Sequence, residues 1–93
     1  MNKQHTALMA AEDGVVVVND TTAYTAKRFN AFYVSEDTVI GNLEVNGVVA
    51  DVTANYITTP ATGIKAGVLV TSFGDDVFSA ITLTSGSVAL IVA

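Results

Sequence analysis

The chain has 93 residues, of which 51% are hydrophobic and 14% are charged, and its net charge at pH 7 is −5. This length supports a single domain, and the small number of basic residues argues against nucleic acid as a direct ligand. No cysteine is present, which excludes disulfides and thiolate metal sites, and no segment approaches the roughly 20 apolar residues of a membrane helix.

The low content of charged residues indicates that part of the surface of the folded domain is apolar. Charged residues make up about 25% of an ordinary domain, and a domain this short buries only roughly 60–65% of the surface of its unfolded chain. We therefore expect other copies of the chain, or another protein, to cover part of the apolar surface. The alternative is a small, well-packed monomer with an exterior rich in Thr and Ser.

The first segment, "MNKQHTALMAAEDG", differs from the rest. Good helix formers follow Thr6, a potential N-cap, but they span about two turns, which is marginal for an isolated helix. We expect residues 1–14 to form an N-terminal arm that orders against a partner or frays, and residues 15–93 to form a single β domain. The segment also lacks the apolar core of a signal peptide, so we expect no secretion signal.

Four consecutive valines follow the arm: Val15, Val16, Val17 and Val18. An uninterrupted apolar run favours a strand that is covered on both faces. At the open edge of a sheet, such a run would recruit other chains. The four valines are therefore predicted to lie centrally in the sheet or in a contact between subunits, and they are the candidate interface residues.

The next segment predicts two strands. In an extended chain over 29–34, Phe29 and Phe32 would lie on opposite sides. The pair Glu36-Asp37 indicates a turn, after which residues 38–45 resume as a strand.

A hairpin is predicted around Asn46-Gly47, the pair preferred in a type I′ turn. A two-residue turn there would set Val45 opposite Val48 and Leu43 opposite Ala50. Farther along, Pro60 indicates a connection, residues 64–72 resemble a strand, and "FGDD" from Phe73 predicts a turn.

The chain end predicts a second hairpin at Ser85-Gly86. A two-residue loop would set Ile81 opposite Leu90 and Leu83 opposite Val88, whereas a three-residue loop with a glycine bulge would shift this pairing by one residue. The apolar pattern favours the first register. With seven or so short strands and no long helix, the sequence predicts an all-β fold, a compact antiparallel β-sandwich or small barrel.

Few residues offer chemistry. The sole histidine, His5, lies in the arm, where we expect it to be exposed to solvent. "DVTAN" at Asp51 resembles the start of a calcium loop, but the loop pattern fails because Tyr56 replaces the glycine at its sixth position and Thr62 the glutamate at its twelfth. Asp75-Asp76 beside a glycine is typical of a turn.

Other patterns also have ordinary interpretations. Asn19–Thr21 matches a glycosylation sequon but favours a turn, and the acidic pairs Glu12-Asp13 and Glu36-Asp37 do not face each other as catalytic carboxyls must. The sequence therefore predicts no catalytic residue, no cofactor and no metal site. Aromatic side chains could form a sugar-binding platform, but most are expected in the core; they are Tyr24, Phe29, Phe32, Tyr33, Tyr56, Phe73 and Phe78.

Three motifs carry a resemblance: "EDTVI" at Glu36–Ile40, "KAGV" at Lys65–Val68 and "FSAITLTSG" at Phe78–Gly86. Together they resemble small virion proteins of tailed phages, whose genes recur near capsid genes. The resemblance covers the last two thirds of the chain, and its motifs are patterns of strands and turns.

The resemblance implies a non-enzymatic capsid decoration (cement) protein, typically a homotrimer, made in the host cytoplasm. Such a protein lies on the outer surface of the virion and bridges subunits of the major capsid protein or another virion protein. The acidic charge balance suits that position, since it does not favour contact with packaged DNA. The alternative is a fibre or spike component with a carbohydrate-binding β-sandwich. No membrane partner is expected.

Overall fold

The computed structural model describes residues 14–93. Four strands, β1 (Val15–Val18), β2 (Phe29–Val45), β3 (Leu69–Thr71) and β4 (Phe78–Val92), accompany the short helix α2 (Thr53–Tyr56). The strands form one antiparallel, unclosed sheet in the order β1-β4-β2-β3. The predicted all-β fold is confirmed. The predicted arm, except for Gly14, lies outside the described residues.

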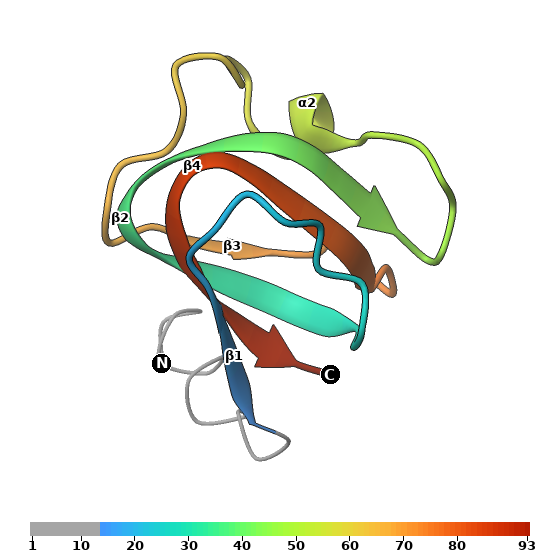
Figure 1. Ribbon diagram of the computed structural model, residues 1–93. Helices are drawn as coiled ribbons and strands as arrows, with labels where there is room; N and C mark the ends of the chain where they lie inside the picture. The colour runs from blue at the N-terminus through green and yellow to red at the C-terminus, as the bar shows by residue number, and fades with distance from the viewer. Residues whose placement is uncertain (1–13) are drawn as a thin grey trace.

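The two long strands β2 and β4 frame the molecule. Their pairing runs from Phe29 opposite Val92 to Val45 opposite Phe78, so the two strands run in opposite directions along one another. Figure 1 shows both as C-shaped ribbons that curl together, which folds the sheet into two layers. The prediction of seven short strands was wrong, as was a turn at Glu36-Asp37, because the chain bends there without leaving β2.

The prediction of a second hairpin at Ser85-Gly86 was also wrong, because β4 continues through Gly86. Gly86 has a φ of +93°, and this left-handed residue bends the strand instead of reversing it. On either side of the bend, Leu83 pairs with Ile40 and Val88 pairs with Val34. The predicted apolar residues do face the core, but their partners belong to β2.

The bend of β2 at Thr38 and the bend of β4 at Gly86 are joined by hydrogen bonds of the Thr38 side chain. Its hydroxyl, in a side chain only 1% exposed, donates to the Glu36 carbonyl at 2.8 Å and accepts from the Ser87 N–H at 3.1 Å. A Cβ atom on Gly86 would lie 2.6 Å from both the Asp37 carbonyl oxygen and the Thr38 Cα. Only glycine therefore lets the bends approach this closely.

An aromatic cluster fills the space between the layers. Phe29 pairs with Val92 and Ala31 with Ile91, so between these two pairs β2 advances by two residues while β4 advances by one. This bulge turns Phe29 and Phe32 to the same side, with ring centroids 6.5 Å apart, and the prediction that they lie on opposite sides was wrong. Phe78 contacts both rings, and all three side chains are fully buried.

The turn at Asn46-Gly47 is confirmed. Asn46 and Gly47 have φ values of 55° and 74°, and the Val48 N–H donates to the Val45 carbonyl at 3.0 Å. These are the two left-handed residues of a type I′ turn.

The second strand of that hairpin is absent, since residues 48–52 form no strand. The physical reason is a carboxylate, because Asp51 accepts the Leu43 N–H at 3.1 Å where a strand carbonyl would have done so. Asp51 also accepts the Thr53 N–H at 2.9 Å, which leads the chain into α2. As predicted, Pro60 lies in a connection and Asp76 closes a turn with Phe73. The strand predicted over 64–72 is limited to Leu69–Thr71.

We expect Gly86→Ala to destabilise the fold by between about 2 and 5 kcal/mol, from the left-handed φ together with overpacking against β2. The matched control is Gly67→Ala, since Gly67 has a φ of +94° but nothing lies within 4 Å of its added Cβ. This control should cost only about 1–2 kcal/mol. Urea unfolding measures both, and equal losses would contradict the packing role of Gly86.

Candidate functional site

Strand β1 lies at one end of the sheet, so its predicted central position was wrong. It pairs antiparallel with β4, from Val15 opposite Ile91 to Val18 opposite Val88. Val18 is buried in the core, whereas Val15 and Val17 are 50% and 62% exposed. The second alternative, a contact between subunits, is untested by the single chain.

The backbone hydrogen-bonding groups of β1 also alternate in direction from one residue to the next. The Val92 N–H donates to the Gly14 carbonyl at 3.1 Å. Since hydrogen-bonded pairs alternate along an antiparallel ladder, Val16 and Val18 direct their N–H and C=O groups to β4. Val15 and Val17 direct theirs away from the sheet. The two most exposed valines of β1 thus also present the outward hydrogen-bonding groups of this edge, along which no strand of residues 14–93 pairs.

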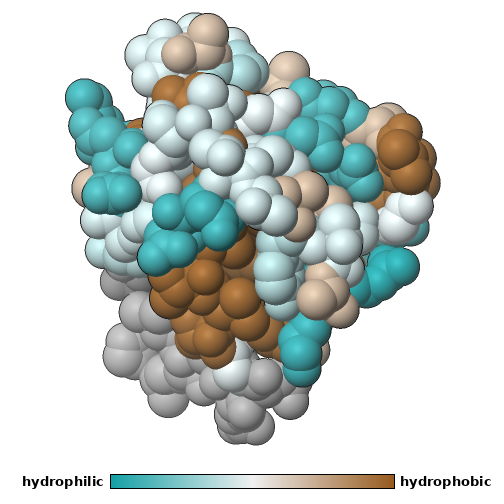
Figure 2. Space-filling model, viewed as in Figure 1, coloured by the Kyte–Doolittle hydropathy of each residue, from teal (hydrophilic) through white to brown (hydrophobic). Residues whose placement is uncertain are grey.

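The sheet surface next to this edge is apolar as well. Register places two rows of side chains on the outer face of this layer, and we call them the outer rows: Val15, Ile91, Ala31 and Thr71; then Val17, Ala89, Tyr33 and Leu69. Neither row contains a charged residue. Tyr33, Ala89 and Leu69 are partly exposed, whereas Ala31 and Ile91 are buried. In Figure 2 the broadest apolar area lies at the lower front, over β1.

The other layer has a polar exterior. Asn42 of β2 lies opposite Thr82 of β4, and its side-chain amide donates to Glu44 at 3.0 Å. On the inner side of this layer, Leu43 and Ile81 are fully buried. Only one of the two layers therefore combines an apolar interior with an apolar exterior.

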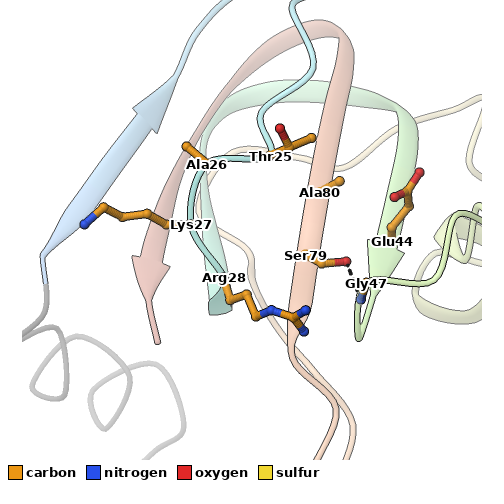
Figure 3. Close-up of a pocket in the computed structure, with 8 residues that line it drawn as sticks. All are labelled: Thr25, Ala26, Lys27, Arg28, Glu44, Gly47, Ser79 and Ala80. Carbon is orange, nitrogen blue, oxygen red and sulfur yellow. Dashed lines mark hydrogen bonds between the residues drawn. The ribbon is translucent and has the colours of Figure 1, made fainter.

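A shallow pocket of about 290 Å³ lies on that polar side, lined by Thr25, Ala26, Lys27, Arg28, Glu44, Gly47, Ser79 and Ala80 (Figure 3). The Gly47 N–H donates to the Ser79 hydroxyl at 3.0 Å. The Arg28 guanidinium lies over the turn, whereas Lys27 points away toward β1. The lining holds one carboxylate and no histidine, so it supplies no paired acid and base.

Asp51, the first residue of the segment that resembles a calcium loop, has a structural role. Its carboxylate accepts three hydrogen bonds, from the Leu43 N–H and from the N–H and hydroxyl of Thr53. Burial acts to raise the pKa of Asp51, but these bonds outweigh it and the pKa is lowered. The carboxylate thus anchors a loop, and no group of three or more potential metal ligands occurs within 14–93.

The remaining candidates are structural or lie outside the described residues. In the sequon segment, the Asp20 carboxylate accepts the Thr22 N–H at 3.0 Å, which confirms a turn. The turn at Asp75-Asp76 is also confirmed. His5 and Glu12-Asp13 lie outside the described residues, so their predicted roles stay predictions.

Phe73 is the exception among the aromatic residues. Its ring is 55% exposed and stacks on Tyr56, with centroids 4.1 Å apart and an interplanar angle of 12°. The Tyr56 hydroxyl accepts the Phe73 N–H at 3.1 Å, and the Tyr56 ring makes a T-shaped contact with the buried Phe78. Phe73 therefore presents a flat aromatic face that is held against the core.

Sequence reasoning missed the outer rows, although a signal was present. Residues 88–92 form an uninterrupted apolar run, the same pattern that singled out the valines of β1, and such a run indicates two covered faces. Assigning it to one arm of a hairpin hid that signal.

No family model, curated protein or solved structure matches this chain. Within the described residues, no helix is long and apolar enough to cross a membrane. The interaction surface formed by β1 and the outer rows is the best-defined candidate site.

The lowered pKa of Asp51 predicts a pH dependence. A carboxylate with a depressed folded-state pKa stabilises the fold above its unfolded pKa of about 3.9, and this contribution is lost as the pH falls through the folded-state value. At pH 7, Asp51→Asn should lower the free energy of unfolding by at most about 1 kcal/mol, because the neutral amide makes weaker hydrogen bonds and the exposed carboxylate is already screened by solvent.

The gap between wild type and variant should shrink below about pH 4. Urea unfolding of both proteins over a pH series checks this. The difference between them isolates Asp51 from Asp37, whose pKa is also lowered, by the Ala66 N–H and by Lys65. A gap that is independent of pH would contradict the assignment.

Proposed function

We propose that this chain is a non-enzymatic structural protein that acts by association, as a homo-oligomeric capsid decoration protein on the outer surface of a virion. The observation that carries the proposal is β1, an edge strand whose Val15 and Val17 expose side chains and backbone groups together.

Association at β1 would satisfy both kinds of exposed group. A strand added along the edge forms main-chain hydrogen bonds with Val15 and Val17 and covers their side chains. A domain of this size buries little surface by itself, so burial between subunits adds stability that its own core does not supply. Cementing a shell needs this property and no reacting groups.

The virion setting is supported by the motif resemblance at Glu36–Ile40, Lys65–Val68 and Phe78–Gly86. It implies a trimer that binds the major capsid protein or another virion protein, and the net charge of −5 suits a position away from packaged DNA. Phe78–Gly86 belongs to a bent strand and not to the hairpin that the motif suggested. The resemblance therefore supports the virion setting through its sequence pattern alone.

We expect Val17→Lys to weaken self-association at least tenfold, about 1.4 kcal/mol, because it places a charge in the apolar contact. The matched control is Val49→Lys in the loop after β2, where Val49 is 90% exposed. Light scattering across a concentration series measures both variants beside the wild type.

Circular dichroism should show that both variants keep the fold, since both side chains are exposed. A wild-type chain that stays monomeric at millimolar concentration, alone and with capsid-like shells, would overturn the proposed function. Equal weakening by the two lysines would remove β1 from the contact.

The second candidate function is a fibre or spike component that binds carbohydrate. It is favoured by Phe73, whose exposed ring is fixed by stacking on Tyr56 and flanked by the polar turn at Asp75-Asp76. A rigid aromatic face that loses little entropy on binding suits a ligand with a flat apolar side and polar edges.

If this second function holds, Phe73→Ala should abolish binding on a glycan array, while Val49→Ala should leave it unchanged. A wild-type protein with no array signal would leave only the structural function.

A further inference from the structure

We propose that β1 of one copy pairs with β3 of the next, so that copies join head to tail through the two edges of their sheets. The inference rests on the proposed self-association and names its geometry. Strand β3 ends the sheet on the side opposite β1.

The outer edge of β3 presents the same pattern as that of β1. The Ser72 N–H donates to the Asn30 carbonyl, and the Val34 N–H donates to the Val68 carbonyl, both at 2.9 Å. The alternation of an antiparallel ladder then turns the backbone groups of Leu69 and Thr71 away from β2. Both residues belong to the outer rows, as Val15 and Val17 do.

Both edge strands are short, at 4 and 3 residues, but neither carries a charged residue or a proline. Edge strands are commonly blunted by charged residues or proline, but β1 reads VVVV and β3 reads LVT. Pairing of β1 with β1 of a second copy would cover one edge and leave β3 unpaired. Pairing of β1 with β3 covers both edges by a single type of contact, and this observation favours the head-to-tail arrangement.

Direction and register agree with this contact. β1 runs antiparallel to β4, β4 to β2 and β2 to β3, so β1 and β3 run in opposite directions. Antiparallel pairing can therefore place Val15 beside Thr71 of the next copy and Val17 beside its Leu69. In both residue pairs, the backbone N–H and C=O groups of each residue point out of its own sheet toward the other copy. Each outer row then continues from one copy to the next.

The charge distribution permits the approach. Each copy carries a net charge of −5, so contacts between acidic surfaces would be repulsive. The outer rows and the two edges carry no charge, which makes them the surface where two like-charged copies can meet. A repeated head-to-tail contact closes into a ring when its rotation permits and otherwise forms a filament.

The absence of native cysteine allows a direct test by disulfide trapping. Val17→Cys and Leu69→Cys are prepared as separate proteins, mixed and oxidised, then separated on non-reducing gels. Paired residues on adjacent strands lie within disulfide range, so the mixture should yield at least about tenfold more heterodimer than Val17→Cys mixed with Val49→Cys. The double variant should form covalent closed rings or longer chains.

The alternatives give different bands. Dimers of Val15→Cys with Val17→Cys, without any between positions 17 and 69, would show two-fold pairing of β1 and overturn this inference while the proposed function stands. Disulfides at positions 17 and 49 as abundant as those at 17 and 69 would also overturn it. A wild-type chain that is monomeric throughout would instead overturn the proposed function itself.

Discussion

The contact between the two bends, where Gly86 of β4 lies against Thr38 of β2, is the constraint on which the architecture depends. Two strands of 17 and 15 residues would otherwise extend as a twisted ribbon with one exposed apolar face. Because both bend at the same level, each strand supplies one arm to each layer. The aromatic cluster of Phe29, Phe32 and Phe78 then packs where the start of β2 meets the start of β4, with Phe29 and Phe78 as backbone partners.

This arrangement also decides which surfaces remain for association. Once both strands have folded back, the short strands β1 and β3 add to the layer that holds the start of β2 and the end of β4. That layer is wide and has an apolar exterior, whereas the opposite layer is covered by polar side chains and loops. The asymmetry thus follows from where the bends fall, and β1 and β3 become the edges of the apolar layer.

Sequence reasoning recovered local features and failed where distant segments compete. The turn at Asn46-Gly47 follows from two residues that tolerate a left-handed backbone, so it was predictable. Ser85-Gly86 offered a similar signal, yet its two flanks pair with β2 because the bends meet at Thr38. The role of Asp51 was hidden, since a carboxylate that replaces a strand carbonyl leaves no periodic pattern. The candidate interface was identified at Val15–Val18, but its edge position requires knowledge of the sheet order.

The asymmetry of the layers has a consequence for orientation at a shell. If the edges join copies head to tail, the outer rows of all copies lie on one face of the assembly, and the polar layers with α2 lie on the other. Burying the apolar face against a shell removes surface that no edge contact covers, whereas the polar side with Glu44 and Asn42 loses hydration if it is buried. In the proposed assembly, edge pairing and shell binding would therefore use different parts of one layer. Each would strengthen the other, because ordered copies would align their partly exposed outer-row residues and a shell would hold the edges at high local concentration.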